Sequence, residues 1–259
     1  MRATRPADPA GATDSEHDDG LNLPLNADPS FASSPTAPPA GAQAITLPCG
    51  TTVWLLPQRA VWWPAARTAF VADMHFGKAA TFRRAGLPVP HGTTADNLAR
   101  LDEVLAVTGA EHLVFLGDFL HARSGAAAAL WEQLLPWRQR HGQVEMTLVR
   151  GNHDLHAGDP PQTLGIALVN EPWRPVEGSA VLACHHPQTA AGATVLAGHL
   201  HPTARLSGPA RDSVRLPCFA WAPGLVVLPA FGAFTGSATD RLPQGTQRFL
   251  VAGSNVRRL

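Results

Sequence analysis

The stretch FVADMHFGKAATFRRAGLPVPHG, residues 70–92, changes from apolar to charged and polar side chains within a few positions. It opens with the apolar run FVA, which is typical of a buried strand, and then places Asp73 and His75 one residue apart. Side chains that directly follow a core strand lie at the edge of a sheet, where loops present them without disturbing the core. The pattern therefore predicts a functional site at the end of this strand.

The same strand-end pattern recurs four more times along the chain. Each time, an apolar β-type run ends in Asp, Asn or His, in the motifs GDFLH (117–121), GNHD (151–154), HH (185–186) and GHLH (198–201). Because the carboxyl ends of parallel strands meet at one edge of a sheet, we expect these side chains to converge. Oxygen and imidazole donors without thiolates suit Mn²⁺, Fe²⁺ or Zn²⁺.

The donors suffice for two divalent ions. Two ions about 3.5–4 Å apart need a bridging carboxylate, and Asp118 is the candidate. The first predicted site consists of Asp73, His75, Asp118 and His201, and the second of Asp118, Asn152, His185 and His199. Adjacent residues leave a strand on opposite faces, so either His185 or His186 could be the ligand.

The periodicity of the chain predicts one α/β domain. Residues 1–43 are rich in Pro, Ala, Asp and Ser and predict a disordered tail, followed by a folded domain over 44–259. Apolar residues at helical spacing predict a helix over 93–109, with a Thr N-cap and a stop at Gly109. A βαβα first half and a strand-rich second half predict two packed sheets.

The bulk composition limits the cellular context and the partners. Residues 1–44 hold six acidic and two basic side chains, which leaves 18 basic against 14 acidic in the rest, a balance that suits an anionic partner. Three widely spaced cysteines indicate a reducing compartment. Neither a signal peptide nor an apolar run of about 18 residues is present, so we expect a cytoplasmic protein without a membrane span.

From residue 67 to 202, the order of the motifs resembles the calcineurin-like metallophosphoesterases. The strings HFGKAATFRRAGLPVP, GDFLHARSG, RGNHD, HHP, GHLHP and LPAFGAFTG are similar to the ligase-associated DNA damage response endonucleases, the PdeM group, from about residue 45 onward. The resemblance implies a four-layer αββα sandwich, two divalent ions, and a metal-activated water that attacks a phosphodiester. It favours Mn²⁺, with Fe²⁺ or Zn²⁺ as alternatives, and His185 rather than His186 as the ligand.

Two residues of the GNHD motif are candidates for catalysis. His153 is expected to act as the general acid toward the leaving oxygen, because imidazole titrates near physiological pH. Asp154 is expected to accept a hydrogen bond from His153 and so to hold its tautomer.

Further residues are candidates for substrate binding. Lys78, the only lysine of the chain, and Arg84 are expected to contact phosphates that flank the scissile one, and Arg83 and Arg123 are further candidates. His121 and His186 are expected to face the substrate or to support the ligands.

The leading functional hypothesis is a Mn²⁺-dependent DNA endonuclease with a role in DNA repair. The resemblance implies association with an ATP-dependent DNA ligase, a helicase and an exonuclease. The alternative is a phosphatase or a phosphodiesterase acting on small or cyclic nucleotides. A non-catalytic scaffold is a remote alternative, because Asp73, Asn152, His153 and His199 are all present.

Overall fold

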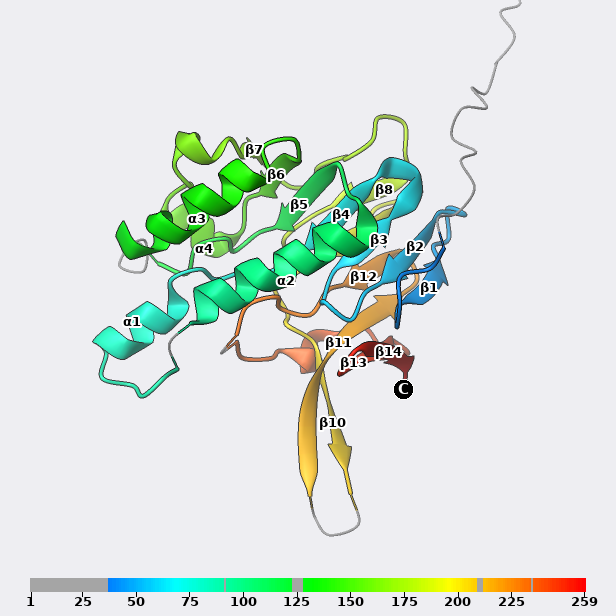
Figure 1. Ribbon diagram of the computed structural model, residues 1–259. Helices are drawn as coiled ribbons and strands as arrows, with labels where there is room; N and C mark the ends of the chain where they lie inside the picture. Colours follow the sequence, from blue (N-terminus) through cyan, green and yellow to red (C-terminus); the bar gives the residue numbers. More distant parts are fainter. Residues whose placement is uncertain (1–36, 91, 123–127, 209–211, 234) are drawn as a thin grey trace, which may run out of the picture. The chain divides into compact units, whose positions relative to one another are not determined.

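Two β-sheets form the frame of the protein, here a computed structural model (Figure 1). The structure describes residues 37–90, 92–122, 128–208, 212–233 and 235–259. Within these residues each sheet has seven strands.

In the first sheet the strands lie side by side in chain order, and the pairing changes from antiparallel to parallel at the fourth strand. Its members are β1 (Gln43–Thr46), β2 (Thr52–Leu55), β3 (Val61–Trp63), β4 (Thr68–Val71), β5 (His112–Leu116), β6 (Glu145–Val149) and β7 (Ala167–Val169). The pairs from β1 to β4 are antiparallel, whereas β4 to β7 run parallel. The parallel strands are covered on both faces, which explains their nearly continuous apolar sequences.

The second sheet contains the carboxy-terminal strands. Its order is β14 (Asn255–Arg258), β13 (Gln247–Ala252), β11 (Ser213–Ala222), β12 (Leu225–Val227), β9 (Thr194–Ala197) and β8 (Val181–Ala183), with β10 (Thr203–Ser207) paired to β11. The strands β8, β9 and β12 run parallel, so β8 and β9 end at the same edge.

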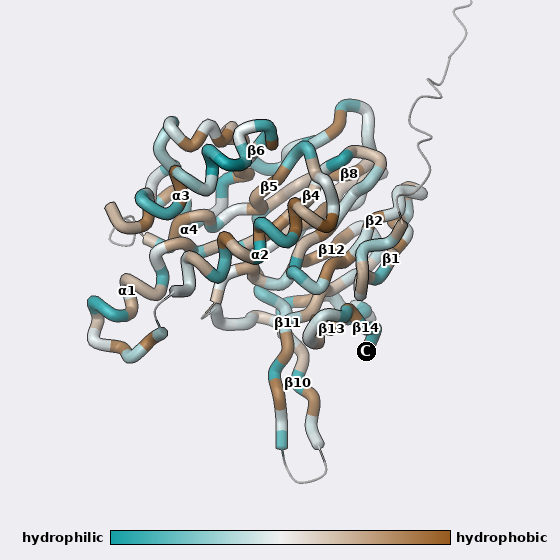
Figure 2. Tube along the Cα trace, in the orientation of Figure 1, coloured by the Kyte–Doolittle hydropathy of each residue, from teal (hydrophilic) through white to brown (hydrophobic). Residues whose placement is uncertain are grey.

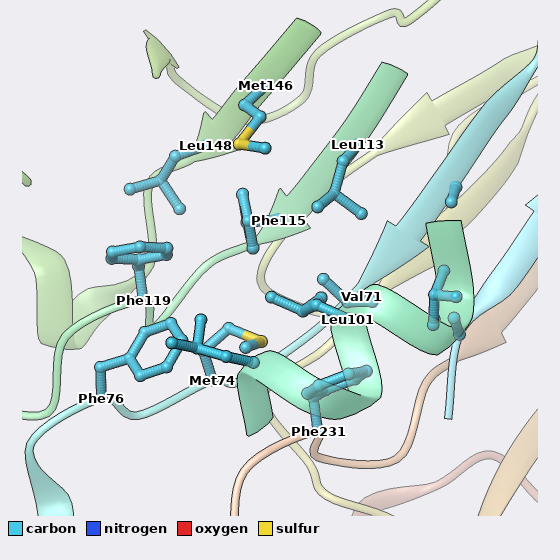
Figure 3. Packing of buried hydrophobic residues seen from close by; sticks show 14 of the residues in the cluster. Val71, Met74, Phe76, Leu101, Leu113, Phe115, Phe119, Met146, Leu148 and Phe231 are labelled. Atoms are coloured by element: carbon cyan, nitrogen blue, oxygen red, sulfur yellow. The ribbon is translucent and has the colours of Figure 1, made fainter. Parts of the chain in front are cut away.

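Helices cover the outer face of the first sheet. They are chiefly α2 (Thr93–Thr108) and α3 (Ala128–Arg140), whereas the short helices α1 (Lys78–Arg84) and α4 (Asn152–Ala157) follow β4 and β6 near the end of the sheet. Leu101 of α2 and Trp137 of α3 pack with Val71 and Phe115 of the sheet in one buried cluster, part of which Figure 3 shows. The predicted end of α2 at Gly109 is confirmed.

The predicted N-cap of α2 is wrong. Gly92, not a threonine, occupies the N-cap position, with φ 89° and no side-chain capping bond. Thr93 is already the first helical residue. Glycine suits this position because the backbone enters the helix from the left-handed region.

The inner faces of the two sheets form a second core. Phe70 of β4 packs there with Phe219 of β11 and Phe249 of β13. Its neighbour Val71 points to the opposite face, toward the helices, as the two-residue period of a strand requires. Hydrophobic colour accordingly concentrates on central strands such as β4, β5 and β12, whereas α2 alternates (Figure 2).

The α/β sandwich predicted from the sequence is confirmed, with a thin fourth layer. In the described residues, the outer face of the second sheet is covered by loops and the short 3₁₀ helix η5 (Thr239–Arg241). Residues 1–36 lie outside the described residues, so the boundary between residues 43 and 44 stays a prediction. Among the described residues, no helix is both long and apolar enough to cross a membrane.

Candidate active site

The five motifs meet at the carboxyl ends of strands from both sheets. Asp73 follows β4, Asp118 follows β5, Asn152 follows β6, His185 follows β8 and His199 follows β9. The convergence predicted from the sequence is confirmed, because the donor atoms of these residues lie within hydrogen-bonding or near-contact distance of one another.

The backbone at these positions is unusual. The φ angles of Asp73 (54°), His75 (46°), Asp118 (50°), His199 (70°) and His201 (46°) are all positive. In the described chain only two other non-glycine residues share this property. The left-handed region costs an L-residue about 1–2 kcal/mol, and such strain gathers at functional sites. The sharp turns aim successive side chains into one volume.

A first cluster joins Asp73, His75 and His201. The Nδ1–H of His201 donates to the carbonyl of Gly236 at 3.2 Å, which leaves its Nε2 with a lone pair. That Nε2 lies 3.4 Å from Nε2 of His75 and 3.4 Å from Oδ1 of Asp73. Burial lowers the pKa of His75, so its ring is neutral and can offer a lone pair as well.

A second cluster surrounds the fully buried ring of His185. Its Nδ1–H donates to the carbonyl of Leu116 at 3.0 Å, so its Nε2 carries a lone pair. Three further donor atoms face that nitrogen: Oδ1 of Asn152 at 2.9 Å, Nδ1 of His199 at 3.1 Å and Oδ1 of Asp118 at 3.4 Å. This geometry favours His185 over His186 as the ligand.

Asp118 lies between the two clusters. Its Oδ1 is near His185, while its Oδ2 is 3.8 Å from Nε2 of His75. The converging atoms are mostly acceptors with few protons among them, and buried acceptors at such distances repel one another unless a cation separates them. The residues therefore fit two divalent ions that share the Asp118 carboxylate.

Glycines allow the ligand loops to approach closely. A Cβ on Gly151 would lie 2.5 Å from Oδ1 of Asp118, and one on Gly198 would lie 2.7 Å from Oδ2 of Asp73. A Cβ on Gly117 would overlap the ring of His185. Each of these glycines directly precedes a predicted metal donor, and this position in the sequence is the feature that indicates their steric role.

His153 lies beside the clusters with a partly exposed side chain. Its Nδ1–H donates to the carbonyl of His121 at 3.1 Å, and its Nε2 is 3.9 Å from Oδ2 of Asp118. The rings of His121 and His153 stack with centroids 5.3 Å apart. Burial lowers the pKa of His121 to about 4, so this ring is neutral at physiological pH.

The predicted pairing of Asp154 with His153 is wrong. The Asp154 carboxylate accepts backbone N–H groups instead, from Phe119 at 2.9 Å, Leu120 at 3.3 Å and Gly151 at 2.9 Å. The residue thereby ties the loop after β5 to the start of α4. Burial raises its pKa to about 6, although the amide hydrogen bonds act in the opposite direction.

The predicted phosphate contacts fall on or near α1. Lys78 is the first residue of the helix, and burial lowers its pKa. The charges of Asp118 and Asp73 partly oppose this effect, so the ammonium group lies within electrostatic reach of the clusters. Arg84 is exposed at the far end of the helix, and Arg83 donates to the carbonyl of Pro90 at 2.9 Å. Arg123 lies outside the described residues.

Sequence reasoning missed Glu171, which holds the two neighbouring histidines. Its Oε2 accepts the backbone N–H groups of His185 at 2.7 Å and His186 at 2.8 Å, and its Oε1 lies 2.5 Å from Nδ1 of His186. Burial disfavours the carboxylate, but these hydrogen bonds outweigh burial and lower the pKa of Glu171. Nothing adjacent in the sequence marks this role.

We expect Glu171→Ala to weaken metal binding. Without the carboxylate, two partly buried N–H groups lose their acceptor and the His185 backbone loosens. Changes in residues that orient ligands typically cost about 10–100-fold in metal affinity. Mn²⁺ titration followed by calorimetry should show such a loss, whereas the exposed Glu177→Ala should bind like the wild type. Equal affinity in the two variants would contradict the role of Glu171.

Two arginines brace the loop behind the first cluster and were also missed. Arg59 donates to the carbonyls of Ala230 and Phe231, and Arg100 donates to the carbonyl of Phe231 at 2.7 Å. The loop in turn donates from Phe231 N–H to the carbonyl of Ala72 and from Gly232 N–H to that of Asp73. Burial lowers the pKa of Arg59 to about 10, so it stays charged.

The two packed sheets and the paired acceptor clusters at their shared edge define a class of hydrolases that use two metal ions. The model of the family described as calcineurin-like phosphoesterase matches residues 66–201, which is over half of the chain. The chain belongs to this family, whose members depend on two metal ions.

The chain is also similar to solved structures. A Pseudomonas putida structure described as the nuclease MPE is 41% identical, with a TM-score of 0.71, over 84% of this chain and 100% of that one. A phosphoesterase from E. coli, YfcE, is 16% identical, with a TM-score of 0.37, over 74% of this chain and 97% of that one. A search of curated proteins found no match.

Proposed function

We propose that the protein is a Mn²⁺-dependent phosphodiesterase that cleaves DNA internally and acts in DNA repair. One observation carries the proposal: the two donor clusters share Asp118 in a chain that is 41% identical to a nuclease. The donor set of carboxylate, amide and imidazole suits Mn²⁺, with Fe²⁺ or Zn²⁺ as alternatives. Association with a ligase, a helicase and an exonuclease, and a cytoplasmic location, stay predictions.

The chemistry follows from the positions of the residues around the clusters. Bound ions would lower the pKa of a water to about 7 and withdraw charge from the phosphoryl oxygens. Asp73, His75, Asp118 and His201 would hold one ion, and Asp118, Asn152, His185 and His199 the other. Lys78 would attract the anionic substrate to the open side of the site.

His153 would protonate the leaving oxygen. The carbonyl of His121 orients its ring, and its Nε2 faces the clusters. A proton on that nitrogen can pass to the departing alkoxide as the P–O bond breaks. His121 and His186 would line the approach of the substrate on either side.

The direct test compares two substrates. Metal-stripped protein with added Mn²⁺ is incubated with circular single-stranded DNA and with bis-p-nitrophenyl phosphate. Linear products and fragments from the circle would support an endonuclease. Hydrolysis of the small diester with an intact circle would instead favour the alternative, a phosphatase or a phosphodiesterase of small or cyclic nucleotides.

We expect His153→Ala to affect the two substrates unequally. The p-nitrophenolate group leaves without protonation, whereas a sugar alkoxide needs a proton, and general acid catalysis contributes about 10²–10⁴-fold. Turnover of DNA should therefore fall by about that factor, with a much smaller loss on bis-p-nitrophenyl phosphate. A uniform loss on both substrates would rule out the general-acid role, and Leu155→Ala, at an exposed position of the same helix, serves as the control.

A further inference from the structure

A basic cleft opens beside the first cluster, at the base of the β10–β11 hairpin. Its volume is about 290 Å³, and it is lined by Thr203, Arg205, Arg215, Ser237, Thr239 and Arg248. Three guanidinium groups and three hydroxyls thus face one space, and among the described side chains the lining contains no carboxylate. The hairpin extends away from the rest of the two sheets (Figure 1).

The register of the hairpin sets two like charges against each other. Arg205 of β10 lies directly opposite Arg215 of β11. Like charges at such a cross-strand position are destabilising. Arg205 donates to the hydroxyl of Ser213 at 2.7 Å, and the ion pairs found among the described residues involve none of the three cleft arginines. An anion between the guanidinium groups would remove this repulsion.

The walls of the cleft adjoin donor residues of the candidate active site along the chain. Its first residue, Thr203, comes two positions after the donor His201. On the other wall, Ser237 follows Gly236, whose carbonyl accepts a hydrogen bond from the His201 ring. The hydroxyl of Thr203 donates to that of Ser237 at 3.0 Å, which joins the two walls. Arg205 is four residues beyond His201, which is at most about 14 Å of chain.

We propose that this cleft binds the phosphate backbone of the DNA strand at a position next to the scissile phosphodiester. The inference rests on the proposed function and extends it to the path of the substrate. Guanidinium forks match phosphate oxygens in two-point contacts, and backbone contacts of this kind position a strand without reading its sequence. An open cleft leading away from the metal donors suits a continuing strand better than a single small anion.

The test is the double variant Arg205→Ala/Arg215→Ala in the full chain. Binding of a labelled single-stranded 20-mer is measured by anisotropy without added metal, and cleavage is measured with Mn²⁺ on the 20-mer and on bis-p-nitrophenyl phosphate. The matched control is Arg67→Ala/Arg174→Ala, which removes the same charge away from the cleft. We expect about tenfold weaker binding of the 20-mer, and two lost phosphate contacts should reduce the salt slope by about 1.4.

The outcomes separate this inference from the proposed function. Weaker binding and a raised KM for the 20-mer, with the small diester and the control double variant unaffected, would support the cleft. Unchanged affinity in a variant whose parent cleaves DNA would overturn the cleft and leave the nuclease standing. If the unmodified protein neither binds nor cleaves the 20-mer, both proposals fall.

Discussion

Asp118→Asn should abolish Mn²⁺-dependent turnover while leaving the fold intact. The carboxylate lies between the two clusters, 3.4 Å from His185 Nε2 and 3.8 Å from His75 Nε2, so both predicted ions depend on its charge. Metal ions supply several kcal/mol of transition-state stabilisation, and a loss of about 4 kcal/mol corresponds to roughly 10³-fold in rate. Asparagine keeps the size of the side chain and tolerates the positive φ.

The same variant should also change how the metal affects stability. In the metal-free protein, one fewer buried charge means less repulsion among the acceptors, so the Tm should equal or exceed that of the wild type. Added Mn²⁺ should raise the Tm of the wild type but not that of the variant. Asp96→Asn, on the exposed first turn of α2, is the control and should retain the Mn²⁺ response. A full Mn²⁺ response in Asp118→Asn would refute the bridging role.

Gly117→Ala should destabilise the protein by about 2–5 kcal/mol. Two costs combine: the backbone has φ 76°, and the new methyl group would overlap the His185 ring, which is buried and cannot move aside. The left-handed conformation costs about 1–2 kcal/mol and overpacking of a filled site about 1–3 kcal/mol. Unfolding in urea, followed by circular dichroism, measures the change in the free energy of unfolding.

Gly109→Ala separates the two costs. Gly109 also has a positive φ, 61°, but a Cβ there would meet nothing within 4 Å. This variant should therefore lose only the backbone part, about 1–2 kcal/mol. Equal losses in the two variants would show that the His185 ring yields to the methyl group, contrary to our expectation.

The predicted metal donors were accessible from sequence because each follows an apolar strand. Asp73, Asp118 and His185 all come two residues after the end of a strand, and parallel strands place such positions at one edge. The strand-rich second half was predictable from its short apolar runs. The end of α2 was predictable from the glycine at position 109, directly after the apolar positions at helical spacing. Local periodicity and chain punctuation carry this information without any long-range contact.

The residues that sequence reasoning missed act across long separations. Glu171 lies 14 residues from His185, and Arg59 contacts the carbonyl of Ala230 across 171 residues. The role of Asp154 was misjudged because proximity to His153 in the chain suggested a contact, whereas the helix directs its carboxylate toward the amides of Phe119 and Gly151. Apart from the local bond of Asp154 to Gly151, which is a capping box at the start of α4, no pattern within a motif encodes these directions.

The sequence by itself determined which residue types end each core strand, and hence the donor set and the two-sheet architecture. Only the tertiary structure decided how these donors are oriented. Ring tautomers depend on distant carbonyls such as those of Leu116 and Gly236, and the facing of Arg205 with Arg215 depends on strand register. Composition and periodicity act locally, whereas hydrogen-bond direction and charge repulsion exist only once distant segments are brought together.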